Sequence, residues 1–130
     1  MIRRADLGIC NLTPFRGPGA DAGTVFELGL MIGLGKRVFA YTNERADYID
    51  RVRASRAITR DAASEVWRDG DGLMVEDFGN ADNLMLDCGL RQHGGGAILR
   101  PEGRIADPLH DLTMFEACLR RAAEALGKTA

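Results

Sequence analysis

The sequence has few residues that could cross-link a small fold or hold a metal ion. Three cysteines, Cys10, Cys88 and Cys118, lie far apart and form no Cys-x-x-Cys pair. Their scarcity argues against a disulfide framework and a zinc knuckle, and it fits a reducing, cytoplasmic setting. The two histidines, His93 and His110, lack matched Cys or Asp neighbours, so we expect no metal and no cofactor.

Long apolar runs and an excess of charge of one sign are also absent. The apolar stretches are too short to span a bilayer. The opening residues, MIRRADLG, are charged and lack the apolar core of a signal peptide. The formal net charge of -2 provides no electrostatic attraction to nucleic acid or to an anionic membrane. We therefore expect neither as a partner.

What remains is an ordinary globular composition, with 45% hydrophobic and 28% charged residues. A chain of 130 residues has the usual size of one domain, and it buries roughly two-thirds of its unfolded-chain surface. No internal repeat, low-complexity tract or linker is visible. We therefore predict a single domain over residues 1–130.

The first third of the chain has the order strand, loop, helix, strand. Residues 7–12 are typical of a short buried strand, and a loop rich in glycine and proline follows. An apolar helix is expected from about 24 to 34, with Asp21 as its N-cap and Gly35 at its end. Residues 37–42 form the second predicted strand. One βαβ unit predicts parallel strands joined by a right-handed crossover.

The remaining elements are predicted from weaker patterns. In chain order we expect an exposed polar helical region at 45–64, a strand at 72–75, a helix at 83–91, a glycine break at 94–96, a strand at 97–99, and a terminal helix from Pro108 to about 126. The apolar residues with helical spacing in that last helix are Leu109, Leu112, Phe115, Cys118, Leu119, Ala122 and Leu126.

A single carboxylate inside the apolar helix is the first candidate functional group. Glu27 stands beside Phe26 and Leu28, and a carboxylate is costly to bury unless something compensates its charge. In the first turns of a helix the macrodipole and free N–H groups provide that compensation. We expect an ionised, desolvated and fixed carboxylate, as a nucleophile requires. The alternative is a capping role, which is common for acidic residues near helix starts.

Small residues surround this carboxylate. Gly23, Thr24 and Gly29 would let a ligand or another backbone approach the helix start closely; ordinary turn and packing chemistry is the alternative. The preceding loop lacks the Lys-Ser/Thr pair of a P-loop and the spacing of GxGxxG, so it is a weak phosphate motif.

A second candidate site lies at the start of the helix predicted at 83–91. Asp82 or Asn83 would cap this helix and Met85 would pack in the core if the segment has a structural role only. The functional alternative is that the Asn83 amide binds hydroxyls while Met85 packs against a base or sugar.

Three motifs together resemble the nucleoside 2-deoxyribosyltransferases. They are DxGTxxELG at 21–29, GKxVxxYTN at 35–43 and DNLM at 82–85, and the similarity runs from about residue 5 to residue 90. The resemblance implies an α/β fold with a flavodoxin-like, doubly wound parallel sheet in three α/β/α layers. It also implies transfer of a 2-deoxyribosyl group from one nucleobase to another.

The resemblance assigns roles to individual residues. Glu27 matches the glutamate that attacks C1′ and forms a covalent sugar intermediate, while Asp21 and Asp6 match aspartates that contact the base and assist its departure. Asn83 and Met85 match a pair lent to the active site of a neighbouring subunit, which implies a dimer or larger homo-oligomer with a shared site. The further candidate substrate-binding residues are Gly23, Thr24 and Asn11.

The chemistry of this reaction sets a geometric expectation. Cleavage passes through an oxocarbenium-like state that a carboxylate stabilises and then traps, and the base needs an acid to protonate it as it leaves. Two neighbouring carboxyl groups raise one of their pKa values. By analogy with retaining glycosidases, we predict that the carboxyl of Asp21 or Asp6 lies roughly 5–5.5 Å from that of Glu27.

The chain departs from the family at its start, where members carry another strand with a glycine-containing loop and a helix. Relative to the family it is N-terminally truncated. Three explanations stay open: a wrongly assigned start codon, a partner subunit that fills the gap, or a degenerate relative that binds without turnover. An unpaired inner strand is an aggregation hazard, so we expect tight oligomerisation.

Two other functions compete with the transferase. A nucleoside or nucleotide N-glycosidase would use the same nucleophile with water as acceptor. The pattern PGxxxGTxxE at 18–27 also resembles phosphoribohydrolases that release cytokinin bases, but Ala20 replaces their second glycine and the spacing is one residue longer. Arg16 is the only basic residue in this loop. The third hypothesis is a non-catalytic nucleotide-binding or assembly subunit.

Overall fold

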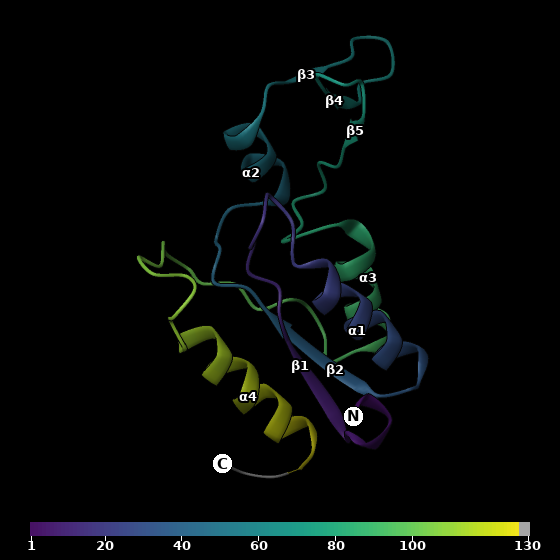
Figure 1. The fold of residues 1–130 in the computed structure, drawn as a ribbon, viewed down its shortest axis with the longest axis vertical. Coiled ribbons are helices and arrows are strands. Elements are labelled where there is room, and N and C mark those ends of the chain that lie inside the picture. The colour runs from purple at the N-terminus through teal and green to yellow at the C-terminus, as the bar shows by residue number, and fades with distance from the viewer. Residues whose placement is uncertain (128–130) are drawn as a thin grey trace.

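The computed structural model describes residues 1–127 and shows an α/β fold with helices on both faces of a parallel sheet (Figure 1). Strand β1 (Leu7–Asn11) pairs in parallel with β2 (Arg37–Tyr41). Leu99 adds one parallel bridge to the far side of β2. The predicted βαβ unit and its parallel pairing are confirmed, whereas the strand predicted at 97–99 is reduced to this bridge.

Helix α1 (Ala22–Gly33) connects β1 to β2 and has both predicted ends. The Asp21 side chain accepts a hydrogen bond from the Thr24 N–H at 3.1 Å. At the other end Gly35 has φ +68, and the Lys36 N–H donates to the Met31 carbonyl at 2.9 Å. This left-handed glycine satisfies carbonyls that the helix leaves open and turns the chain into β2.

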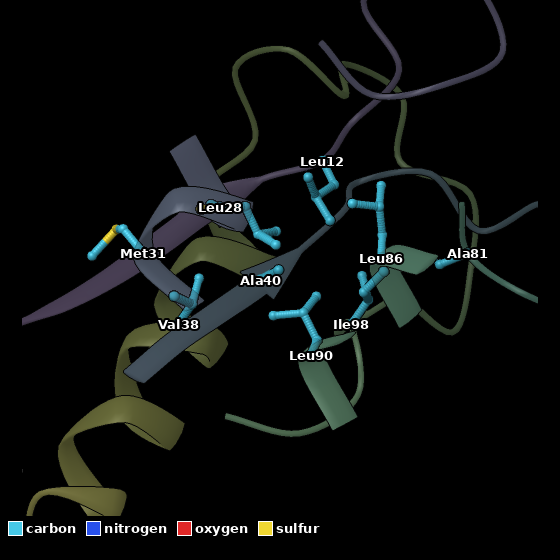
Figure 2. Packing of buried hydrophobic residues seen from close by; sticks show 10 residues of the cluster. Leu12, Leu28, Met31, Val38, Ala40, Ala81, Leu86, Leu90 and Ile98 are labelled. Carbon is cyan, nitrogen blue, oxygen red and sulfur yellow. The ribbon is translucent and has the colours of Figure 1, made fainter. Parts of the chain in front are cut away.

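The core lies on both faces of the strands, because successive side chains of a strand point to opposite faces. On one face α1 and α3 (Leu84–His93) pack over the sheet through Leu28 and Leu90 (Figure 2). On the other face α4 (Thr113–Ala125) packs through Cys118 against Phe39. The predicted three-layer α/β/α class is confirmed.

A small antiparallel sheet projects from this body (Figure 1). It consists of β3 (Ile58–Arg60), β4 (Trp67–Asp69) and β5 (Met74–Val75). Trp67 and Val75 pack onto the buried side of α2 (Tyr48–Ser55). The predicted helical region at 45–64 is therefore wrong after Ser55, and the strand predicted at 72–75 belongs to this separate sheet.

The terminal helix begins later than predicted. Residues 108–110 form a turn, and α4 starts at Thr113, whose N–H donates to the Asp111 carboxylate at 2.8 Å. Leu109 and Leu112 are therefore exposed rather than part of the buried helical stripe. No helix within residues 1–127 is long and apolar enough to cross a membrane.

Candidate functional site

Glu27 faces a groove between α1, the start of β1 and the first residues of the chain. The groove has a volume of about 590 Å³, and its lining is mainly apolar and includes Ile2, Leu7 and Met31. Ile2 belongs to a short 3-10 helix, η1 (Ile2–Arg4), which packs beside α1. This volume is within the usual range of small-molecule sites, about 300–1,000 Å³.

The groove adjoins a strand with a free edge. The Leu12 N–H, directly after β1, donates to the Tyr41 carbonyl at 2.8 Å, and backbone groups alternate in direction along a strand. The N–H groups of Ile9 and Asn11 therefore point away from β2. Among residues 1–127 no other strand pairs with this outer edge of β1.

The Glu27 side chain is exposed, so the expected desolvation is wrong for the single chain. Within the described residues its carboxylate has no hydrogen bond or ion pair. The physical reason is the face of α1 on which each residue lies. Leu28 and Met31 face the sheet, while Phe26 lies on the outer face and is 70% exposed. Nothing in residues 1–127 covers this side of α1 as the core covers the other.

Glu27 nevertheless lies close enough to β1 for its charge to act on the Cys10 thiol. Burial raises the pKa of the Cys10 thiol to about 11, and the negative charge of Glu27 adds to that increase. Cys10 does not line the groove, and the second charged side chain in the groove lining is Arg4.

The two predicted aspartates lie at different ends of β1. A Cβ on Gly8 would come within 2.6 Å of Met31 Sδ, so the last turns of α1 pack over the start of the strand. The first turn of α1, with Asp21, therefore lies toward the carboxyl end of β1, whereas Asp6 precedes its amino end. A strand of five residues is about 16 Å long.

Asp21 and Thr24 at the start of α1, and Asn11 at the last position of β1, therefore lie toward one end of the strand, and Asp6 lies at the other. Along α1 the six positions from Asp21 to Glu27 correspond to about 9 Å of helix axis. Both aspartates are exposed, and the Asp21 carboxylate is engaged as the N-cap. The separation of about 5–5.5 Å from Glu27 stays a prediction.

Gly23 and Gly29 differ in what surrounds them. A Cβ on Gly23 would lie 3.0 Å from the Asp21 Oδ2, so this glycine leaves room for the capping carboxylate. A Cβ on Gly29 would have no neighbour within 4 Å, so packing inside the chain does not explain that glycine.

Asn83 and Met85 stand at the start of α3. The Asn83 Oδ1 accepts the Met85 N–H at 2.9 Å, and its Nδ2 donates to Glu76 at 3.0 Å. Capping by Asn83 is therefore confirmed. Met85 is 74% exposed, so the core interpretation of this side chain is wrong, and its thioether is open to contact from outside the chain.

Comparison with known proteins connects this geometry to a family. The sequence profile of the nucleoside 2-deoxyribosyltransferase family matches residues 1–85, and this segment contains every predicted site residue. The chain belongs to the nucleoside 2-deoxyribosyltransferase family. A 2-deoxyribosyltransferase structure from Leishmania mexicana is similar with a TM-score of 0.63 and 30% identity, covering 95% of this chain and 61% of that one.

An uncharacterised protein of Schizosaccharomyces pombe is also similar to this deoxyribosyltransferase-family chain. The two are 33% identical over 106 residues, which cover 73% of this chain and 50% of the yeast protein. The chain therefore spans between half and about three-fifths of the length of these relatives.

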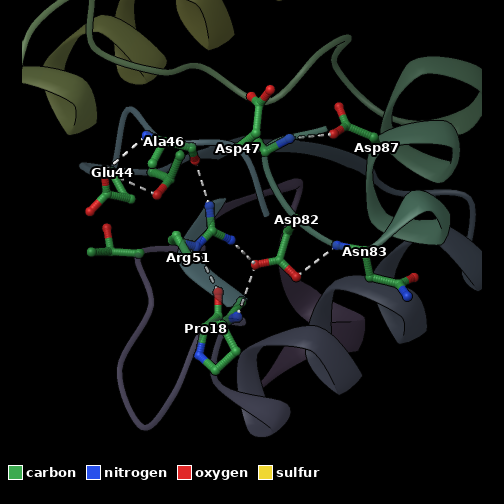
Figure 3. A network of polar contacts seen from close by, with 12 residues as sticks. Pro18, Glu44, Ala46, Asp47, Arg51, Asp82, Asn83 and Asp87 are labelled. Carbon is green, nitrogen blue, oxygen red and sulfur yellow. Dashed lines mark hydrogen bonds and ion pairs between the residues drawn. The ribbon is translucent and has the colours of Figure 1, made fainter. Parts of the chain in front are cut away.

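Two polar features of this deoxyribosyltransferase-family member were missed from sequence. Asn43, in the GKxVxxYTN motif, is buried and donates to the carbonyls of Pro108 and Asp111 at 2.8 Å each, so it holds the segment before α4. Asp82, in the DNLM motif, forms a buried ion pair with Arg51 of α2 (Figure 3). The motifs mark Asn43 and Asp82, but no sequence pattern marks Arg51.

A second, polar cavity of about 550 Å³ lies after β2 and Leu99, lined in part by Asp47, Arg100 and Arg104. Arg100 and Asp47, both in its lining, form an ion pair with each other. Among the described residues no group of three His, Cys, Asp or Glu side chains is placed to hold a metal ion.

Proposed function

We propose that this chain cleaves the N-glycosidic bond of a 2-deoxyribonucleoside through a covalent Glu27–sugar intermediate and transfers the sugar to another base. The observation that carries the proposal is the position of Glu27: the residue that matches the family nucleophile faces a groove of nucleoside size, about 590 Å³. The family match over residues 1–85 supports the same assignment.

The reaction needs two displacements at one carbon. A Glu27 carboxylate oxygen bonds to C1′ as the C1′–N bond breaks, and the departing base takes a proton from Asp21 or Asp6. The incoming base then attacks C1′ through a ring nitrogen, and the ester bond between Glu27 and C1′ breaks. The proton on that ring nitrogen passes to the aspartate. Two inversions retain the configuration of the sugar.

An exposed nucleophile needs a cover, which we propose is a second copy of the chain. Water reduces the electrostatic stabilisation that a carboxylate gives an oxocarbenium-like state. Exposed groups on both sides support a shared site, since Phe26 beside the nucleophile is 70% exposed and Met85 on α3 is 74% exposed. In this arrangement the neighbour lends Asn83 and Met85.

Hydrolysis is the second candidate, and the exposure of Glu27 favours it. Water that reaches C1′ of the intermediate would compete with an incoming base and release free deoxyribose. A binding role without turnover is the third candidate, because Glu27 is exposed and the Asp21 carboxylate is engaged as the N-cap of α1.

Incubation with deoxyinosine and adenine distinguishes the three candidates. Formation of deoxyadenosine supports the transferase, deoxyribose with hypoxanthine supports the hydrolase, and an unchanged mixture contradicts both. Glu27→Gln keeps the shape of the side chain and removes the nucleophilic charge, so it should abolish product formation. Glu116→Gln is the matched control, because Glu116 is also an exposed helical glutamate but lies on α4.

A further inference from the structure

One buried carboxylate joins the two segments that carry the proposed site. The Asp82 Oδ2 accepts the Ala20 N–H at 3.0 Å, and its Oδ1 accepts the Asn83 N–H at 2.8 Å (Figure 3). Ala20 directly precedes the N-cap of α1, and Asn83 is the N-cap of α3. The side chain of Asp82 is only 6% exposed.

Arg51 completes this junction from α2. Its guanidinium donates to the Asp82 carboxylate at 3.2 Å, to the Pro18 carbonyl at 2.7 Å and to the Ala46 carbonyl at 2.7 Å. The side chain is 8% exposed. Since Pro18 belongs to the loop before α1, the loop is held twice, once by each member of the pair.

The pair is electrostatically costly and therefore needs these bonds. Burial raises the pKa of Asp82, while the Asn83 N–H, Arg51 and the Ala20 N–H act in the opposite direction. Burial likewise lowers the pKa of Arg51, opposed by the charge of Asp82. A buried ion pair is weak evidence for added stability, but its fixed geometry can specify one arrangement of the chain.

We propose that Arg51 and Asp82 are positioning residues for nucleoside turnover, because they lock the loop before α1 and the start of α3 into one arrangement. The inference rests on the proposed function. Asp82 is adjacent in sequence to Asn83, and Ala20 to Asp21, so a shift of this carboxylate moves both groups. A misplacement of about 1 Å can lower a rate by about 10²-fold.

Asp82→Asn tests the link with little change in shape. The native carboxylate accepts hydrogen bonds on both oxygens, whereas an asparagine amide accepts on one side and donates on the other. One of the two N–H groups, of Ala20 or Asn83, then faces another donor. We expect faster hydrogen exchange, measured by NMR, at the amide that loses its acceptor.

Asp87→Asn is the matched control. Asp87 is another buried aspartate, but its carboxylate accepts the Ala81 N–H at 3.1 Å and does not reach the loop before α1. In folded protein we expect Asp82→Asn to lower kcat by about 10²-fold with a small change in KM. Asp87→Asn should leave kcat within a few-fold of wild type. Equal losses of kcat in the two variants would contradict a positioning role.

Arg51 provides the second variant pair. Arg51→Lys keeps the charge and part of the hydrogen bonding, while Arg51→Met keeps only the apolar length. We expect kcat to fall in the order wild type, Lys, Met, and partial recovery in Arg51→Lys at unchanged folding supports positioning. A kcat equal to that of wild type in all folded Arg51 and Asp82 variants overturns the inference.

Failure of the proposed function gives a different result. If the wild-type chain turns over no nucleoside, the proposed function fails. The exchange measurement still decides the link, because loss of protection at either the Ala20 or the Asn83 amide in Asp82→Asn supports it. Retained protection at both amides overturns it.

Discussion

The Thr24 N–H donates to the Asp21 carboxylate at 3.1 Å, and this bond begins the helix that carries Glu27. Asp21 thus has a structural role that is visible in the chain and a proposed role as an acid. A serine at position 21 would keep the first role, because a hydroxyl caps a helix about as well as a carboxylate. The same serine would remove the second role.

Substitution at Asp21 therefore separates stability from turnover. We expect Asp21→Ala to lower the free energy of unfolding by about 1 kcal/mol and Asp21→Ser to leave it nearly unchanged. Both variants should have a lower kcat, because base departure lacks its acid. Deoxyinosine consumption measures kcat, and urea unfolding curves measure stability. Full activity in Asp21→Ser would exclude this aspartate as the acid and leave Asp6 as the candidate.

The buried thiols predict a loss of stability in alkali. Burial raises the pKa values of Cys10 and Cys118 from 9.0 to about 11. The folded state therefore favours the protonated thiol. The contribution of each raised pKa to the free energy of unfolding is complete below pH 9.0 and is lost as pH rises through about 11. We expect the free energy of unfolding, obtained from urea curves, to fall over this interval by up to about 2–3 kcal/mol for each thiol.

Cys10→Ala measures one part of that alkaline loss. The variant leaves a small cavity and is less stable at neutral pH, but its stability should decline less steeply with pH because one raised pKa is gone. Cys88→Ala is the comparison, since Cys88 is only half-buried. Parallel pH curves for Cys10→Ala and wild type would contradict the burial-driven pKa of Cys10.

Two glycines should respond in opposite directions to alanine. A Cβ on Gly95 would lie 2.1 Å from the Phe39 ring, which is fully buried. Gly95→Ala should therefore destabilise the fold by about 1–3 kcal/mol through overpacking. Gly33 in α1 has nothing within 4 Å of the added atom, so Gly33→Ala should stabilise by about 0.5–1 kcal/mol through helix propensity. Thermal unfolding of both variants checks the contrast.

A shared active site predicts complementation between two inactive variants. Met85→Ala removes an exposed side chain, so we expect stability within about 0.5 kcal/mol of wild type and loss of turnover in a shared site. Mixing it with Glu27→Gln should restore activity, because some assembled sites then combine an intact Glu27 with a neighbour's intact Met85. Activity that stays absent after mixing and re-association would contradict a site shared in this way.

The elements that were predicted well from sequence depend on local chemistry. β1, α1 and β2 are adjacent in the chain, and each is defined by an apolar run with Asp21 or Gly35 at the boundary. The antiparallel sheet was missed because β3, β4 and β5 have only two or three residues each. Strands that short have no measurable periodicity, and their pairing depends on contacts with Ile49 and Val52 of α2.

The sequence by itself determined the parallel βαβ unit, the capped start of α1 and the motifs that place the chain in its family, because those features depend on neighbouring residues. Only the tertiary structure decided that Glu27 is exposed, that Asp6 and Asp21 lie at opposite ends of β1, and that Arg51 binds Asp82. Burial and pairing between distant positions depend on which helix faces meet. No local pattern in a single sequence indicates which faces meet.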